Sequence, residues 1–184
     1  MIEMKMRKLL YLVLGASCLL SACTEAEKPK SDLRAPAYPL VTIDPYTSAW
    51  STTDNLYDSP VKHWTGKNHP LIGVVRVDGK SYRFMGKEAP EKETPVRFEK
   101  AAVQQSVNVL PTQTYYTFKC GPVCLDLVFT SPLLLEDLDR MSTPVNYISW
   151  QVRAMDEKAH ETRLTIEASP SLAVHSNDQA VTVA

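Results

Sequence analysis

The chain has 184 residues, of which 44% are hydrophobic and 22% are charged, and its formal net charge is −1. This balance excludes a strongly basic surface, so nucleic acid is not an expected partner. All 13 prolines follow residue 22 and interrupt the remaining sequence at short intervals, which excludes long helices.

The first 22 residues predict a secretory signal peptide. Basic residues such as Lys5 and Lys8 precede an apolar run over residues 9–20, which is shorter than the roughly 20 apolar residues of a transmembrane helix. The ending Leu20-Ser21-Ala22-Cys23 is typical of a lipoprotein signal. We therefore expect Cys23 to be acylated, with palmitate among its chains, and to anchor the protein to a bacterial outer membrane, on its periplasmic or its surface side. The alternative is an ordinary signal peptide with a chance cysteine.

The sequence after the signal divides into two parts. Residues 23–36 hold prolines among small and charged residues and predict a flexible tether. Residues 37–184 predict the folded region. Its last residues, 179–183, alternate as in a strand, so we expect the sandwich to be truncated here and the chain to be the front of a longer protein.

Alternating apolar residues predict strands over most of the folded region. Strands over residues 71–77 and 80–85 flank Asp78-Gly79, which favours a two-residue type I′ hairpin. A second hairpin is expected from residues 112–119 and 123–130, about Gly121-Pro122, and a third pair from residues 145–154 and 161–168. Repeated hairpins of this kind predict an all-β fold, an antiparallel β-sandwich.

Two segments are less regular. Residues 97–110 have a composition that fits a helix or a long strand, and the spacing of the valines favours the strand. Residues 133–139 predict one short helical turn between strands, with Glu136, Asp137 and Asp139 as solvated surface charge rather than as a catalytic acid and base.

The two cysteines of the folded region lie close together, at Cys120 and Cys124, around a predicted hairpin turn. A three-residue loop makes a disulfide feasible, whereas a two-residue Gly-Pro loop places the two side chains on opposite faces as free thiols. Two thiolates alone lack the partners of a metal site.

No self-contained active site is predicted. The histidines show no metal-ligand spacing, and only His63 has neighbours suited to a site, while His160 lies in a predicted turn and His175 close to the end of the sequence. The sequence contains neither a nucleophile elbow nor a phosphate-binding glycine loop, so no catalytic residue, metal or cofactor is expected.

One aromatic and polar cluster is a candidate interface or pocket. It comprises Asp44, Tyr46, Trp50, Lys62, His63 and Trp64. Large aromatic rings with hydrogen-bonding edges suit three roles: plugging the sandwich, contacting another domain, or contacting substrate.

Several motifs, in order along the chain, resemble the N-terminal region of the glutaminase A family. They lie at residues 37–51, 62–66, 76–86, 111–118, 129–134 and 140–147. The resemblance implies an N-terminal β-sandwich followed by a helical toroid of the six-hairpin type, and the family name implies hydrolysis of the glutamine amide. Neither substrate nor toroid follows from this sequence itself.

The expected function is therefore that of a non-catalytic N-terminal region. It would tether and support a downstream catalytic domain of a glutaminase-like amidohydrolase or a glycosidase-like hydrolase, with that domain and the membrane as its partners. Two alternatives stay open: a carbohydrate-binding module of a glycoside-hydrolase-like protein, and a free-standing structural lipoprotein of the envelope.

Overall fold

A computed structural model describes residues 34–87, 100–174, 176 and 179–182. The signal peptide, Cys23, most of the tether and His175 lie outside the described residues. The described residues belong to one compact unit. Within the described part, no helix is long and apolar enough to cross a membrane.

The described residues are mainly β-strands. The strands are β1 (Tyr38–Thr42), β2 (Ser48–Ser51), β3 (Leu71–Val77), β4 (Lys80–Met85), β5 (Lys100–Ala101), β6 (Val103–Leu110), β7 (Gln113–Cys120), β8 (Val123–Thr130), β9 (Tyr147–Ala154) and β10 (Thr162–Ala168). A short α-helix, α2 (Leu138–Met141), and a 3-10 helix, η2 (Pro170–Ala173), complete the elements. The prediction of an all-β sandwich is confirmed.

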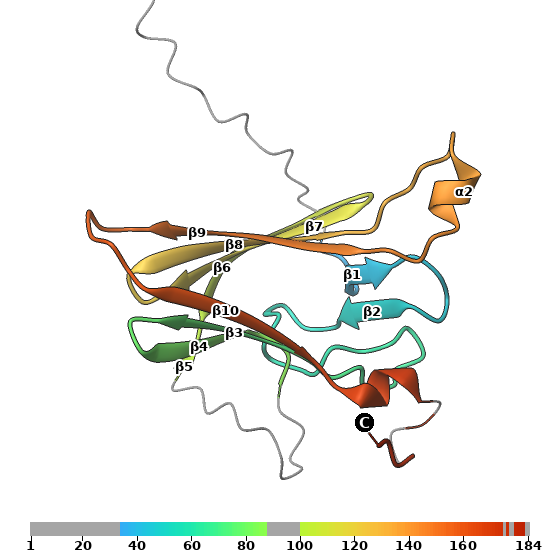
Figure 1. The fold of residues 1–184 in the computed structure, drawn as a ribbon, viewed down its shortest axis with the longest axis horizontal. Coiled ribbons are helices and arrows are strands. Elements are labelled where there is room, and N and C mark those ends of the chain that lie inside the picture. Colours follow the sequence, from blue (N-terminus) through green and yellow to red (C-terminus); the bar gives the residue numbers. More distant parts are fainter. Residues whose placement is uncertain (1–33, 88–99, 175, 177–178, 183–184) are drawn as a thin grey trace, which may run out of the picture. The chain divides into compact units, whose positions relative to one another are not determined.

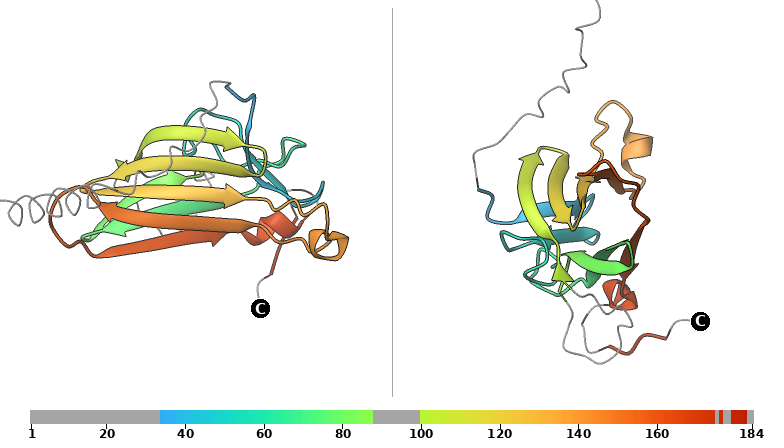
Figure 2. Two further views of the ribbon diagram at one scale, coloured as in Figure 1. Left: turned by 90° about the horizontal axis from the view of Figure 1, so that it is seen from above. Right: turned by 90° about the vertical axis from the view of Figure 1, so that its left-hand side faces the viewer.

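Two four-stranded sheets form the layers of the sandwich (Figure 1). One has the order β10-β3-β4-β5 and the other β6-β7-β8-β9, while β1 and β2 form a small third sheet. All strand pairs are antiparallel except the short β4–β5 pair, which is parallel. The end-on view in Figure 2 shows β9 and β10 on the same side of the sandwich.

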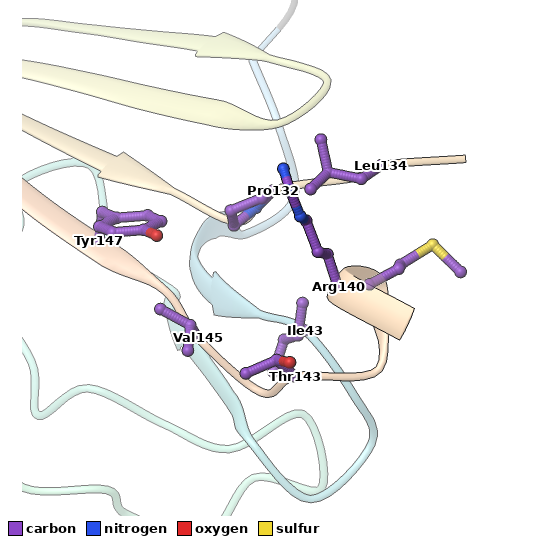
Figure 3. Close-up of a pocket in the computed structure, with 8 residues that line it drawn as sticks. Ile43, Pro132, Leu134, Arg140, Thr143, Val145 and Tyr147 are labelled. Atoms are coloured by element: carbon purple, nitrogen blue, oxygen red, sulfur yellow. The ribbon is translucent and has the colours of Figure 1, made fainter. Parts of the chain in front are cut away.

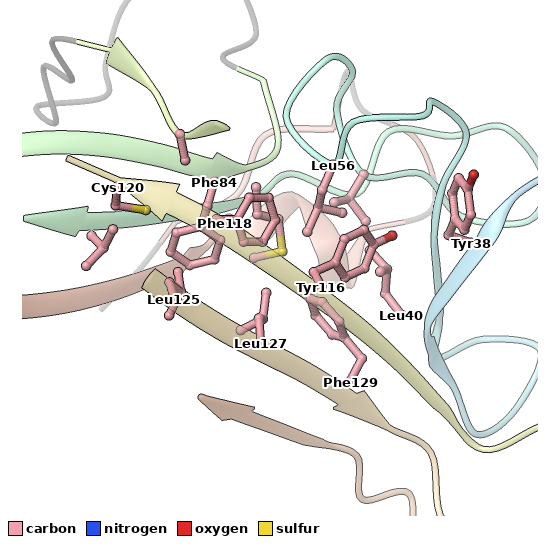
Figure 4. Close-up of a cluster of buried hydrophobic side chains, with 14 of the residues drawn as sticks. Tyr38, Leu40, Leu56, Phe84, Tyr116, Phe118, Cys120, Leu125, Leu127 and Phe129 are labelled. Atoms are coloured by element: carbon pink, nitrogen blue, oxygen red, sulfur yellow. The ribbon is translucent and has the colours of Figure 1, made fainter. Parts of the chain in front are cut away.

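The core lies between the two larger sheets, because alternate residues of their strands face inward (Figure 4). On β7 and β8 the pattern is strict, and every second residue is buried. The largest fully buried side chains are Tyr116, Phe84, Phe118, Phe129, Leu40, Leu56, Met85, Leu125 and Leu127. The ring of Phe84 approaches that of Phe118 at 5.8 Å between centroids, which joins the two sheets.

The local predictions about turns hold. Strands β3 and β4 have the predicted bounds, and both Asp78 and Gly79 have positive φ, at 48° and 85°, as a type I′ turn requires. Strands β7 and β8 pair around Gly121-Pro122. Within residues 97–110, the described part forms β5 and β6, so the strand interpretation is confirmed over the helix. The expected single long strand is wrong, because β5 and β6 belong to different sheets.

The third predicted pair is wrong in its pairing. Strands β9 and β10 both form, but β9 pairs with β8 and β10 pairs with β3, in different sheets. The alternation of residues shows which face a strand buries and not which strand lies beside it. The connection over residues 155–161 therefore carries the chain from one layer to the other.

The two ends of the sandwich have different connections. The turn end holds the Asp78-Gly79 turn, the Gly121-Pro122 turn and residues 155–161. The loop end holds residues 43–47 between β1 and β2, residues 131–146 between β8 and β9, and η2 (Figure 1).

Candidate interaction surface

Asp44 organises the loop between β1 and β2. Its Oδ1 accepts hydrogen bonds from the backbone N–H of Tyr46 at 2.7 Å and of Thr47 at 2.8 Å. The hydrogen bond from Thr47, and to a smaller extent that from Tyr46, lowers the pKa of the Asp44 carboxyl group. The turn leaves Tyr46 projecting, with 90% of its surface exposed.

His63 and Trp64 bind the same loop from a neighbouring segment. His63 Nε2 and Trp64 Nε1 both lie 2.8 Å from the carbonyl oxygen of Pro45. Because that oxygen only accepts, Nε2 of His63 carries a proton, and Nδ1 faces the hydroxyl of Thr65 at 2.8 Å. The indole N–H of Trp64 is thus satisfied internally, while the side chain stays 63% exposed.

The other two residues of the predicted cluster have structural contacts. Trp50 is half-buried and its Nε1 donates to Ser48 Oγ at 2.7 Å. The backbone of Lys62 pairs with that of Trp50 and with that of Asn68. The structure therefore brings the six predicted residues together. Of the three roles considered for them, plugging the sandwich does not fit Trp64, which faces solvent.

A larger apolar surface, which sequence reasoning missed, lies beside this cluster in residues 131–146, named here the leucine connection. Its leucines are Leu133, Leu134, Leu135 and Leu138, and they are 42 to 67% exposed. The helical turn predicted over residues 133–139 forms later in the chain, as α2 (Leu138–Met141), and it buries no residue. Four leucines without strand or helix periodicity were the available signal in the sequence.

The leucine connection is held by polar bonds rather than by apolar packing. At its base, Ser131 Oγ accepts from the backbone N–H of Thr42 at 3.0 Å and donates to Asn146 Oδ1 at 2.7 Å. At its tip, Asp137 caps α2 by accepting from the N–H of Arg140 at 3.0 Å, and the two side chains form an ion pair. Asp137 thus has a structural role.

A groove of about 380 Å³ lies under the leucine connection (Figure 3). Its apolar lining consists of Ile43, Pro132, Leu134, Met141, Val145 and Tyr147, and Arg140 and Thr143 add polar groups. Figure 3 shows Leu134 and Arg140 opposite Val145 and Ile43, with the space between them open.

The end of the described chain reaches the loop end as well. The 3-10 helix η2 follows β10, and the backbone N–H of Ser169 donates to Pro70 O at 3.0 Å. Lys67 Nζ donates to the carbonyl oxygen of Val174. The segment that carries Trp64 and the last part of the chain are therefore neighbours.

The turn end carries a polar cluster, and here the prediction that only His63 has suitable neighbours is wrong. His160 Nδ1 lies 2.6 Å from Asp78 Oδ2, and Nε2 lies 2.7 Å from Asp156 Oδ1. The bonds to Asp156 and then to Asp78 raise the pKa of His160, and the bond to His160 lowers the pKa of each aspartate. This cluster connects the β3–β4 turn to the β9–β10 connection.

The structure also places His69 and the two cysteines of the folded region. His69 is buried, with its ring 5.0 Å from that of His63, and burial lowers its pKa. Cys120 and Cys124 are free thiols, and their two-residue turn places them on opposite faces, the alternative that does not allow a disulfide. Burial raises the pKa of Cys120 to about 12. Among the described residues, no group of three or more His, Cys, Asp or Glu is placed to hold a metal ion.

Comparisons with known proteins agree with the family resemblance. A family described as a domain of unknown function (DUF4964) matches residues 12–96, and another domain of unknown function (DUF5127) matches residues 112–184. Glutaminase A of Aspergillus oryzae is 29% identical over 147 residues, which cover 76% of this chain and 20% of that protein. The chain therefore spans about a fifth of the length of this curated relative. No solved structure matches. These similarities support a glutaminase A-like N-terminal region.

Proposed function

We propose that this chain is the non-catalytic N-terminal β-sandwich of an envelope-anchored hydrolase similar to glutaminase A. The sandwich tethers and supports a catalytic domain, a helical toroid, that follows it in the same polypeptide. The observation that carries the proposal is the match to glutaminase A, which extends over most of this chain and over only a fifth of the relative.

The described geometry supports a role without chemistry. His63 is engaged by Pro45 and Thr65, and His160 is engaged by two carboxylates that also belong to turns. The thiols of Cys120 and Cys124 ionise less readily than a free cysteine, because burial raises their pKa values. The described part thus offers no nucleophile paired with a free base.

Activity measurements on two polypeptides test the catalytic part of the proposal. Residues 23–184 are expected to hydrolyse neither glutamine nor aryl glycosides, whereas the polypeptide that continues beyond residue 184 hydrolyses one of these classes. Turnover by residues 23–184 that disappears in His63→Ala would instead assign an active site to the aromatic cluster.

Fractionation of cells tests the anchor. The leader sequence supports acylation of Cys23, so the parent protein is expected in the membrane fraction with diacylglyceryl on its N-terminal cysteine. Cys23→Ala is expected in the soluble fraction. Unchanged membrane association of this variant contradicts the anchor.

A second candidate function, carbohydrate binding, is favoured by one observation. Tyr46 and Trp64 are both strongly exposed, and Pro45 connects them. Such rings can stack on sugar faces. Retarded migration of the chain in gels containing soluble polysaccharide, lost in Trp64→Ala, supports this candidate. Equal migration with and without polysaccharide excludes it for the sugars tested.

A further inference from the structure

We infer that the leucine connection and the groove beneath it receive an apolar face of the catalytic domain that follows this chain in the same polypeptide. The inference rests on the proposed function and adds the surface through which the two domains meet. It concerns residues 131–146, for which the sequence predicts only a short helical turn with surface charge.

The length of the leucine connection is the first argument. Strands β8 and β9 are hydrogen-bonded neighbours whose pairing starts at Thr130 and Tyr147, so a short hairpin loop of about two to five residues could join them. The chain instead makes a long excursion over residues 131–146. Connections of that length in a compact domain usually have a function of their own.

The solvent exposure of the leucines is the second argument. The inner face of β8 is complete without them, because Leu125, Leu127 and Phe129 are already fully buried. The bonds of Ser131 and Asp137 hold the excursion in a defined shape that presents Leu133, Leu135 and Leu138 to solvent. An ordered apolar surface next to an open groove is typical of a protein interaction site.

The position of this surface identifies the occupant. The 3-10 helix η2 lies at the loop end, the same end as the leucine connection (Figure 1). Val174 follows it and accepts a hydrogen bond from Lys67. Polypeptide that follows η2 therefore starts from the end of the sandwich that carries the groove. The curated relative is about five times longer than the matched region, so a domain of ample size is available to cover it.

Site-specific photo-crosslinking in the full-length protein tests the inference. The crosslinking amino acid p-benzoylphenylalanine is placed at Leu135, which is 66% exposed, and in a separate variant at Val103, which is 55% exposed and lies at the turn end. Crosslinks from position 135 are expected to join peptides beyond residue 184 of the same molecule. Position 103 is expected to give none of these products.

A paired substitution checks that apolar contact is responsible. Leu134→Ser with Leu138→Ser is expected to remove the crosslinks from position 135, whereas Val103→Ser leaves them in place. Crosslinks to a second copy, crosslinks confined to residues 1–184, or no crosslinks at position 135 each overturn the inference. Hydrolysis that still requires the polypeptide beyond residue 184 would then leave the proposed function standing.

Discussion

At the turn end of the sandwich, His160 forms hydrogen bonds to two aspartates, and three connections meet through hydrogen bonds. At the loop end, by contrast, four leucines, Tyr46 and Trp64 face solvent. The turn end has two large exposed apolar side chains among its described residues, Val103 and Met155, in separate strands and connections. Apolar exposure is thus concentrated at one end.

The difference shows that exposure at the loop end is not a general feature of a small sandwich. Both ends close the same two sheets, and the turn end does so with charged and polar side chains that water solvates well. The loop end keeps its shape through Ser131 and Asp137 and still exposes leucines. This contrast fits an end that contacts another protein surface.

The largest effect expected at either end of the sandwich comes from a comparison of one glycine from each end. Gly121 has φ of 62°, and a Cβ there would lie 2.6 Å from the Tyr82 hydroxyl. Gly66 also has positive φ, at 90°, but a Cβ there would meet nothing within 4 Å. Gly121→Ala should lower the free energy of unfolding by about 2–4 kcal/mol, through backbone strain and overpacking.

Gly66→Ala is the matched control for this comparison. It carries the strain alone, so the expected loss is about 1–2 kcal/mol. Urea unfolding of both variants measures the two values. Equal losses would mean that Tyr82 moves aside freely and that the turn end is not closely packed.

The sequence predicts those parts of this contrast that depend on contacts between residues close together in the chain. Contacts between residues far apart in the chain cannot be predicted in this way. The Asp78-Gly79 hairpin is predictable because two adjacent residues determine the turn. The pairing of β9 and β10 is not, because alternation leaves the neighbouring strand open. The cluster around His160 joins residues 82 positions apart, and no local pattern encodes such a contact.

The candidate site shows the same division. Asp44, Tyr46, His63 and Trp64 are found from sequence because aromatic and polar residues alternate in short, proline-containing segments. In the sequence alone, the leucines of residues 133–138 cannot be distinguished from ordinary apolar residues. Only the structure shows that β8 and β9 are adjacent and that the core is complete without these leucines.

The pH dependence of stability measures the polar closure of the turn end. The pKa of His160 is raised in the fold, so its contribution is fully present below the unfolded value of about 6.5 and is lost as pH rises through the folded pKa. The pKa values of Asp78 and Asp156 are lowered, so their contribution is present above about pH 3.9 and is lost as pH falls through their folded pKa values.

Unfolding of the parent and of His160→Gln at several pH values separates this contribution from the rest of the chain. A free histidine titrates at about pH 6.5. As pH rises from 6 to alkaline values, the free energy of unfolding of the parent should therefore fall more steeply than that of the variant. Parallel pH profiles would show that the bonds between His160 and its two aspartates make no difference to the turn end.

The smallest expected effect on stability is at the loop end. Leu134→Ser combined with Leu138→Ser should change the free energy of unfolding of the chain by no more than about 0.5 kcal/mol, because both leucines are exposed. Leu127→Ala, in the core, should cost about 2–5 kcal/mol by comparison. The paired serines should also raise the solubility of the chain, because they interrupt an apolar patch. A loss of stability close to that of Leu127→Ala would mean that the leucine connection packs against its own sandwich. A partner surface would then not explain the contrast between the two ends.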